Sequence, residues 1–168
     1  MGMAKDESFD ITTGCDLQEV DNAVNQAKRE ITTRFDFKNV LVEIDFDRPN
    51  AKIRVHTSDD YKLEAIWQAL SQRFVARNVP LKNIKRGEVE TASGGTVRQE
   101  MTLTQSIDSD IARKIVKYIK EQKFKKAQAQ VQGDAVRISS PSREELQLVI
   151  AAVKREDWGI ELKYGNYR

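Results

Sequence analysis

Hydrophobic residues recur along the chain with two different periods, and the change from one period to the other separates successive elements. Residues 40–46 carry an apolar side chain at every second position, which predicts a strand with one buried face. Residues 17–31 carry apolar side chains three and four positions apart, which predicts an amphipathic helix behind an Asp16 cap, with Glu19 completing a capping box. The same criteria predict further strands at 9–11, 53–55, 84–90, 97–104, 127–131, 136–138 and 160–164, and further helices at 58–74, 108–119 and 140–153.

The order of these elements occurs twice. Residues 53–55 (Ile-Arg-Val) lie 83 positions before residues 136–138 (Val-Arg-Ile). Earlier in the repeat the offset is near 91 and pairs Val20 with Ile111, so the second half is shorter by about eight residues. Each half has the order βαββαβ, which is that of the ferredoxin-like fold. We therefore predict an α+β protein in which two helices cover one face of each four-stranded antiparallel sheet.

The candidate linker between the two halves is Ala-Ser-Gly-Gly at 92–95. Its position predicts a first domain over residues 8–90, a linker over 91–96 and a second domain over 97–168. Each half has only about 80 residues, a size at which a single domain is marginally stable, so we expect the halves to stabilise each other.

Composition restricts the setting of the protein. The 168 residues are 39% hydrophobic and 32% charged with a net charge of +2, so charge as a whole does not predict strong nonspecific DNA binding. Cys15 is the only cysteine, which excludes an intramolecular disulfide and favours a reducing compartment. There is no apolar run of membrane-spanning length, and residues 1–7 are polar and lack the apolar core of a signal peptide. A cytoplasmic protein without a membrane partner is expected.

The strand alternation indicates which side chains lie on the uncovered face of each sheet. On that face we place seven candidate ligand-binding residues: Arg54, His56, Arg98, Gln128, Gln130, Gln132 and Arg137. Glutamine amides both donate and accept hydrogen bonds, which suits base edges or a partner's backbone, and the arginine fork matches phosphate oxygens. The alternative interpretation is a solvated face whose arginines pair with the neighbouring acids Glu43, Asp45 and Glu100.

The segment 34–38 (Arg-Phe-Asp-Phe-Lys) alternates aromatic rings with charges. Phe35 and Phe37 are candidates for stacking on bases while Arg34 and Lys38 contact phosphates. The alternative is that both rings belong to the core at a junction between helix and strand. We expect five cations to contribute to one anion-binding surface, namely Arg34, Lys38, Arg54, Arg98 and Arg137.

A second basic feature runs from Arg113 to Lys126, where seven Lys and Arg residues accompany a single acid, Glu121. If Ile111, Ile115 and Ile119 face the core, the exposed face of this helix is basic and suited to a phosphate backbone. The four candidate residues on that face are Arg113, Lys114, Lys117 and Lys120. A basic solvated face is the alternative.

Chemistry-bearing motifs are scarce. His56 and Cys15 are single residues of their type and do not assemble a typical zinc site, and neither GxxxxGK[ST] nor GxGxxG occurs. The loop Thr13-Gly14-Cys15-Asp16 has one glycine and an acid, which suits an acyl-phosphate substrate poorly. We therefore predict no metal, no cofactor and no catalytic residues.

Several segments together resemble the YajQ family of bacterial proteins. They are residues 8–11, 33–38, 107–109, 112–117, 127–137, 142–147 and 166–168, and the similarity runs from about residue 8 to the end. The resemblance implies tandem ferredoxin-like domains with exchanged N-terminal strands, and binding of nucleotides or nucleic acid. Some family members are cyclic di-GMP effectors that act with a transcription regulator.

Three function classes follow from these observations. The first is a non-enzymatic binder of nucleotides or RNA that uses the sheet faces, a cleft between the domains and the basic helix 108–121. The second is a regulator gated by cyclic di-GMP that acts through a protein partner such as a transcription regulator. The third is a small phosphatase-like enzyme, which the fold type alone does not support.

Overall fold

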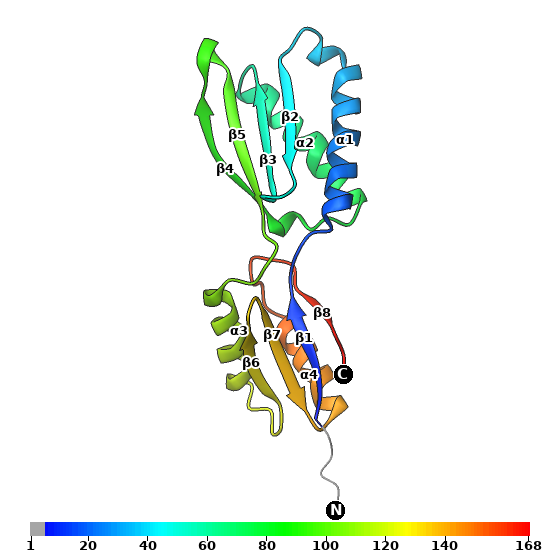
Figure 1. The fold of residues 1–168 in the computed structure, drawn as a ribbon, viewed down its shortest axis with the longest axis vertical. Coiled ribbons are helices and arrows are strands. Elements are labelled where there is room, and N and C mark those ends of the chain that lie inside the picture. The colour runs from blue at the N-terminus through cyan, green and yellow to red at the C-terminus, as the bar shows by residue number, and fades with distance from the viewer. Residues whose placement is uncertain (1–5) are drawn as a thin grey trace, which may run out of the picture. The chain divides into compact units, whose positions relative to one another are not determined.

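The computed structural model describes residues 6–168, so residues 1–5 of the polar N-terminal segment lie outside the described part (Figure 1). The helices are α1 (Leu17–Thr33), α2 (Asp60–Ala76), α3 (Ser109–Glu121) and α4 (Arg143–Lys154). The strands are β1 (Glu7–Thr12), β2 (Val42–Asp47), β3 (Lys52–Thr57), β4 (Ile84–Thr91), β5 (Val97–Leu103), β6 (Gln128–Gln132), β7 (Ala135–Ser140) and β8 (Lys163–Gly165). Among residues 6–168, no helix is long and apolar enough to cross a membrane.

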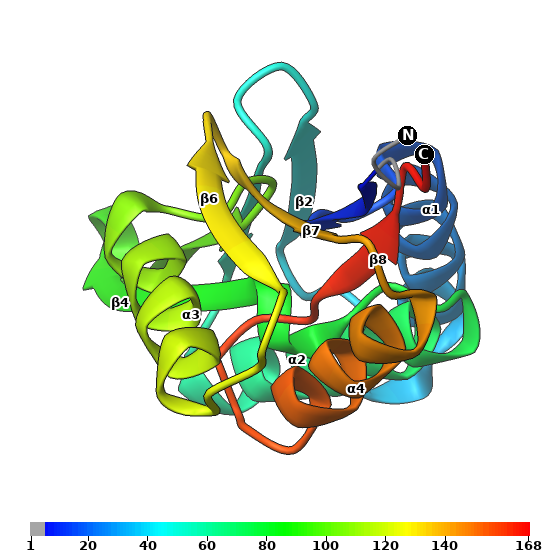
Figure 2. The same cartoon turned by 90° about the horizontal axis from the view of Figure 1, so that it is seen from below.

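The strands form two four-stranded antiparallel sheets, with the orders β2-β3-β5-β4 and β6-β7-β1-β8. Both orders are those of a ferredoxin-like βαββαβ domain in which the first strand comes from the other repeat. β1 thus lies between β7 and β8, and β5 lies between β3 and β4 (Figure 1). Figure 2 shows α3 and α4 on the same side of the second sheet. The predicted fold class is confirmed, including the strand exchange that the family resemblance implied.

The exchange makes the two compact units differ from the two sequence repeats. One unit is the continuous segment Cys15–Gln105, and the other combines the residues up to Gly14 with Ser106–Arg168. We call them the continuous unit and the discontinuous unit. β5, which opens the second sequence repeat, belongs to the continuous unit.

The segment 91–96, predicted as a linker, is a hairpin connection inside the continuous unit. Thr91 lies opposite Val97 in the β4–β5 pair, and the Ala92 N–H donates to the Thr96 carbonyl over 2.7 Å. Gly94 and Gly95 have φ angles of 72° and 76°, which glycine adopts at little cost in a tight turn. The chain passes between the units at residues 14–15 and 105–106 instead. Glycine-rich composition alone does not distinguish a hairpin turn from a linker.

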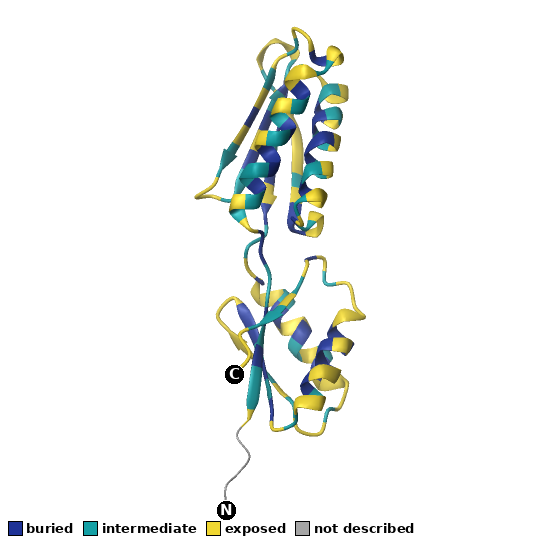
Figure 3. Cartoon of the chain, turned by 90° about the vertical axis from the view of Figure 1, so that its right-hand side faces the viewer, coloured by how far each residue is buried: buried dark blue, intermediate teal, exposed yellow. Residues whose placement is uncertain are grey.

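Helices α1 and α3 begin directly after their capping residues, whereas α2 and α4 begin two and three residues later than predicted. The Asp16 side chain accepts hydrogen bonds from the Gln18 and Glu19 N–H groups over 3.0 and 3.4 Å, and Asp108 accepts from Ile111 over 2.8 Å. Each helix buries one stripe of apolar residues against its sheet, visible as dark blue segments in Figure 3. The helical periodicity therefore identified the core-facing stripes correctly.

The last strand is shorter than predicted and begins later. We expected residues 160–164, and β8 comprises Lys163–Gly165. Its partner β1 ends at Thr12, which lies opposite Lys163, so residues 160–162 have no neighbouring strand to pair with. Ile160 is nevertheless buried, which explains its place in the apolar pattern.

The exchanged strands supply central core residues to both units. Phe9 and Ile11 of β1 are fully buried and pack with Ile115, Val136 and other apolar residues of the discontinuous unit. Met101 of β5 is likewise fully buried in the core of the continuous unit. Each core is therefore completed by a strand from the opposite sequence repeat.

Replacing Phe9 by Ala should destabilise the discontinuous unit by about 3–5 kcal/mol, because the substitution removes a fully buried ring. Native-state hydrogen exchange should then show loss of protection in β6 and β7, more than a hundred residues away, with β2 and β3 unchanged. Phe35→Ala is the matched control, since that ring is 89% exposed and its removal should cost less than about 0.5 kcal/mol. Lost protection in β2 and β3 would contradict the exchange.

Candidate functional site

Arg54, His56 and Arg98 lie on the outward face of the sheet in the continuous unit. In the β3–β5 register Arg54 lies opposite Glu100 and His56 lies opposite Arg98, so these four side chains share one face. The face contains a hollow of about 630 Å³ whose lining also includes Glu43, Asp45, Glu88 and Glu90. The structure thus brings the three candidates together, but among an excess of acids.

Arg54 already forms ion pairs with two neighbouring acids. Its Nη1 lies 3.1 Å from Asp47 Oδ2 and its Nε lies 3.2 Å from Glu100 Oε2. Both carboxylates raise the pKa of Arg54, Asp47 more strongly than Glu100. His56 is also held, with Nδ1 3.2 Å from Glu43 Oε2 and Nε2 2.9 Å from Thr96 Oγ1. This face therefore presents little uncompensated positive charge to an anion.

The segment around η1 (Phe35–Phe37) separates the two phenylalanines. Phe37 is only 6% exposed, so its ring is unavailable for stacking and the prediction of a stacking role is wrong for that residue. Phe35 remains on the surface. Arg34 donates to both oxygens of Asp36 over 3.0 and 2.8 Å and lies 5.3 Å from the Phe37 ring centre, while Lys38 is exposed. Arg34 is therefore partly neutralised in place.

The outward face of the other sheet is different in character. Gln128, Gln130 and Gln132 of β6 are exposed, and Gln130 lies opposite Arg137 of β7. We call these three glutamines together with Arg137 the glutamine face. Arg137 lies opposite Asp10 of β1 and donates to it, with Nε–Oδ1 and Nη2–Oδ2 distances of 2.9 and 3.4 Å. Three uncharged hydrogen-bonding side chains thus stand beside an arginine with one acidic partner.

The Asp10 carboxylate anchors this region. It also accepts a hydrogen bond from Asn166 Nδ2 over 2.6 Å. The hydrogen bond from Arg137 is the largest influence on Asp10 and lowers the pKa of its carboxyl, even though partial burial acts in the opposite direction. Asp10 therefore stays ionised and fixes the orientation of the Arg137 guanidinium.

The basic residues of α3 lie in the same unit as the glutamine face. Ala112, Ile115 and Ile119 are buried, and the opposite side of the helix exposes the four predicted residues Arg113, Lys114, Lys117 and Lys120. Arg113 forms an ion pair with Asp110. α3 packs against β6 on the covered face of the sheet, whereas the glutamines of β6 lie on the uncovered face, so the basic side of α3 and the glutamine face lie on opposite sides of the same edge strand.

The five cations expected on one surface are not brought onto one sheet. Arg34, Lys38, Arg54 and Arg98 belong to the continuous unit, whereas Arg137 belongs to the discontinuous unit. Sequence spacing showed that Arg54 and Arg137 are equivalent in the repeat, but it did not show which acids accompany each.

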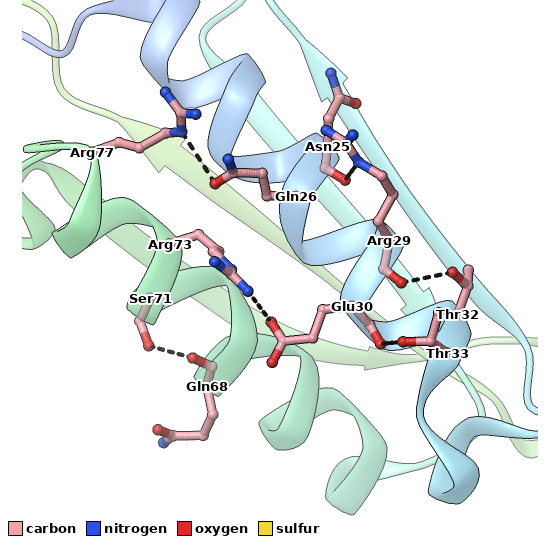
Figure 4. A network of polar contacts seen from close by, with 10 residues as sticks. All are labelled: Asn25, Gln26, Arg29, Glu30, Thr32, Thr33, Gln68, Ser71, Arg73 and Arg77. Carbon is pink, nitrogen blue, oxygen red and sulfur yellow. Dashed lines mark hydrogen bonds and ion pairs between the residues drawn. The ribbon is translucent and has the colours of Figure 1, made fainter.

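Two further arginines serve helix packing. Arg73 of α2 lies 3.4 Å from Glu30 of α1, and Arg77 donates to Gln26 over 3.1 Å, as Figure 4 shows. Arg77 also lies 2.8 Å from Glu19. These contacts bind α1 to α2. Within residues 6–168, no cluster of three or more His, Cys, Asp or Glu side chains is arranged to hold a metal ion.

Periodic sequence patterns did not indicate one further group of surface residues. Tyr167, Arg143 and Gln147 line a hollow of about 530 Å³ in the discontinuous unit, together with Glu7, Ser8, Glu144, Leu146 and Arg168. Arg143 and Gln147 lie in the first turns of a helix and Tyr167 lies beyond the last strand, so no periodic pattern links them. The one available signal was that segments 142–147 and 166–168 both carry the family resemblance.

Fold and surface together define a tandem ferredoxin-like protein with exchanged strands and polar, uncovered sheet faces. Residues 7–168 match the family model described as nucleotide-binding protein YajQ-like, and the chain belongs to the YajQ family. It is 49% identical over 163 residues to a nucleotide-binding protein of Koribacter versatilis, covering 97% of this chain and 98% of the relative. It is 48% identical over 167 residues to a nucleotide-binding protein of Bacillus cereus, covering 99% and 100%. These names state nucleotide binding and no reaction.

The Asp10–Arg137 pair should make stability depend on pH in the acid range. Because folding lowers the pKa of Asp10, the pair stabilises the fold above the unfolded value of about 4 and loses this effect as the pH falls through the lower, folded pKa. Asp10→Asn should therefore reduce the free energy of unfolding near neutral pH by about 1 kcal/mol and flatten its decline below about pH 4.

Urea unfolding across this pH range measures the effect. Asp45→Asn is the control, because the Asp45 side chain is exposed on the other sheet and makes no hydrogen bond or ion pair with the described residues. An acid decline in Asp10→Asn as steep as that of the parent would show that the pair contributes nothing.

Proposed function

We propose that this chain binds nucleotides, and single-stranded nucleic acid such as RNA in particular, without turning them over. The glutamine face reads base edges and the exposed cations of α3 contact phosphates. Relatives that share nearly the whole chain at about 48% identity are named nucleotide-binding proteins, which supports the ligand class. The surroundings of Arg137 support the location.

The contrast between two equivalent arginines carries the proposal. Arg54 and Arg137 occupy the same place in the two repeats, on the third strand of each ferredoxin-like unit and on its uncovered face. Arg54 forms ion pairs with two acids, and more acids line the adjacent hollow. Arg137 has one acid, and its other neighbours on β6 are uncharged glutamines. A phosphate approaching Arg137 therefore meets less negative charge than one approaching Arg54.

The glutamine face suits bases because each amide offers a donor and an acceptor. RNA-binding sheets of this fold type commonly stack bases on aromatic residues of the central strands. Here the outward positions hold glutamine and arginine instead, so hydrogen bonding and phosphate contact replace stacking on this face. Binding should therefore depend strongly on salt.

Cyclic di-GMP presents the same two elements, phosphates and base edges, and belongs among the ligands of this proposal. In this proposal, ligand binding comes first, and association with a protein partner such as a transcription regulator follows from it. Purified protein, tested with mononucleotides, cyclic di-GMP, tRNA and single-stranded oligonucleotides, should bind at least one class and hydrolyse none.

Arg137→Gln should weaken binding of single-stranded RNA about five- to tenfold at low salt and reduce the slope of log affinity against log salt by about 1. Arg54→Gln is the matched control and should change affinity by less than about twofold, because its charge is already compensated. Fluorescence anisotropy with a labelled oligouridylate over a salt series measures both. Equal effects of the two substitutions would contradict the location.

A further inference from the structure

The hollow beside Tyr167 has the construction of a small-ligand pocket. It lies between the first turns of α4 and the chain that follows β8, and its volume is about 530 Å³. The Tyr167 ring is 60% exposed, and Leu146, which is almost fully buried, also lines the hollow. An accessible aromatic ring next to an apolar surface is suited to a flat, partly apolar ligand.

The ring of Tyr167 is held in position from both sides. Its centre lies 6.0 Å from that of the buried Phe9, with 37° between the ring planes. The following residue, Arg168, pairs with Ser8 through two backbone hydrogen bonds of 3.2 and 2.9 Å. The preceding residue, Asn166, donates to Asp10. A surface ring that is fixed in this way loses little conformational freedom when a ligand stacks on it.

Polar groups at the rim offer defined hydrogen bonds. Arg143 donates through Nε to both oxygens of Glu7, over 2.9 and 2.7 Å, and its side chain is 84% exposed. Nη1 and Nη2 of Arg143 donate to none of the described residues, so the end of the guanidinium fork is available. Gln147 is exposed one helical turn further along α4 and presents an amide donor and acceptor.

We infer that this hollow is a nucleobase-binding pocket. A base stacks on Tyr167, the Gln147 amide contacts the base edge, and the free nitrogens of Arg143 meet the attached phosphate. The inference deepens the proposed function and rests on it. The glutamine face has no aromatic ring on which a base can stack. In this inference Tyr167, in another part of the same unit, provides that ring.

The balance of charge in the pocket favours a base over a simple anion. Two acids, Glu7 and Glu144, stand beside the cations Arg143 and Arg168, so phosphate alone gains little net attraction. Stacking of the base on the aromatic ring is the larger contribution available here. The base can come from a free mononucleotide or from a splayed nucleotide within a strand, and both have the same recognition chemistry.

The experiment compares three substitutions in the full chain by isothermal titration calorimetry. UMP, AMP, GMP and oligouridylate serve as ligands, and ribose 5-phosphate serves as the probe that lacks a base. Tyr167→Leu should weaken binding about 5- to 100-fold, and Tyr167→Phe, which keeps the ring, should stay within about threefold of the parent. Tyr61→Leu is the control, since Tyr61 is 90% exposed in the continuous unit and should have no effect.

Each outcome separates the pocket from the proposed function. Nucleotide or oligonucleotide binding that is unchanged in Tyr167→Leu overturns the pocket and leaves the proposed function standing. Failure of the parent chain to bind UMP, AMP, GMP and oligouridylate overturns the pocket, and the proposed function falls with it only when cyclic di-GMP and tRNA also fail to bind. Ribose 5-phosphate binding as tightly as UMP would show an anion site without base recognition. The supporting result is seen by NMR during titration with UMP. The amide resonances of Gln147 and Arg168 should move, and those of the continuous unit should not.

Discussion

The reciprocal exchange of two interior strands is the constraint on which the rest of this structure depends. β1 pairs on both sides with β7 and β8, and β5 pairs on both sides with β3 and β4. An interior strand satisfies two rows of backbone hydrogen bonds and buries one face of side chains, so removing it exposes two strand edges and opens the core. Phe9, Ile11 and Met101 are the fully buried residues that these strands contribute.

The exchange also determines where chemistry gathers. β1 brings Asp10 opposite Arg137 and thereby orients the guanidinium of the glutamine face. The same strand brings Phe9 to the Tyr167 ring and pairs Ser8 with Arg168, which fixes the exposed ring of the hollow beside α4. Residues of β1 and of the segment after β8 thus orient Arg137 and hold Tyr167 in place. In the continuous unit, β5 brings Glu100 to Arg54 and reduces the positive charge of that face.

The local sequence pattern was sufficient to predict most helices and strands, but it was insufficient to predict which strands pair with each other. The spacing of Val20, Val24 and Ile31 and the Asp16 cap predicted α1 because helical contacts and caps lie within a few residues. The equivalence of Arg54 and Arg137 also followed from a simple offset. Strand pairing joins residues far apart in sequence, so the hairpin role of 91–96 did not follow from its Ala-Ser-Gly-Gly composition. The truncated β8 has the same cause.

In the candidate site too, sequence periodicity predicted which residues are exposed but not which residues surround them. Alternation placed the glutamines and Arg137 on an outward face, and the helical period placed Lys114 and Lys117 on the exposed side of α3. The acids that surround Arg54 come from neighbouring strands, and the hollow at Tyr167 is assembled from three separate segments. Such features depend on tertiary contacts, which a single sequence without pairing information does not specify.

Folding of the isolated segment 15–105 tests the strand exchange most directly. This segment contains all four strands of its sheet, both of its helices and the complete core of the continuous unit. We expect it to unfold cooperatively on heating, with hydrogen-exchange protection in β3 and β5. The segment 15–96, which lacks only β5 and the residues that follow it, should show neither. An unfolded 15–105, or equal stability of the two segments, would contradict the exchange.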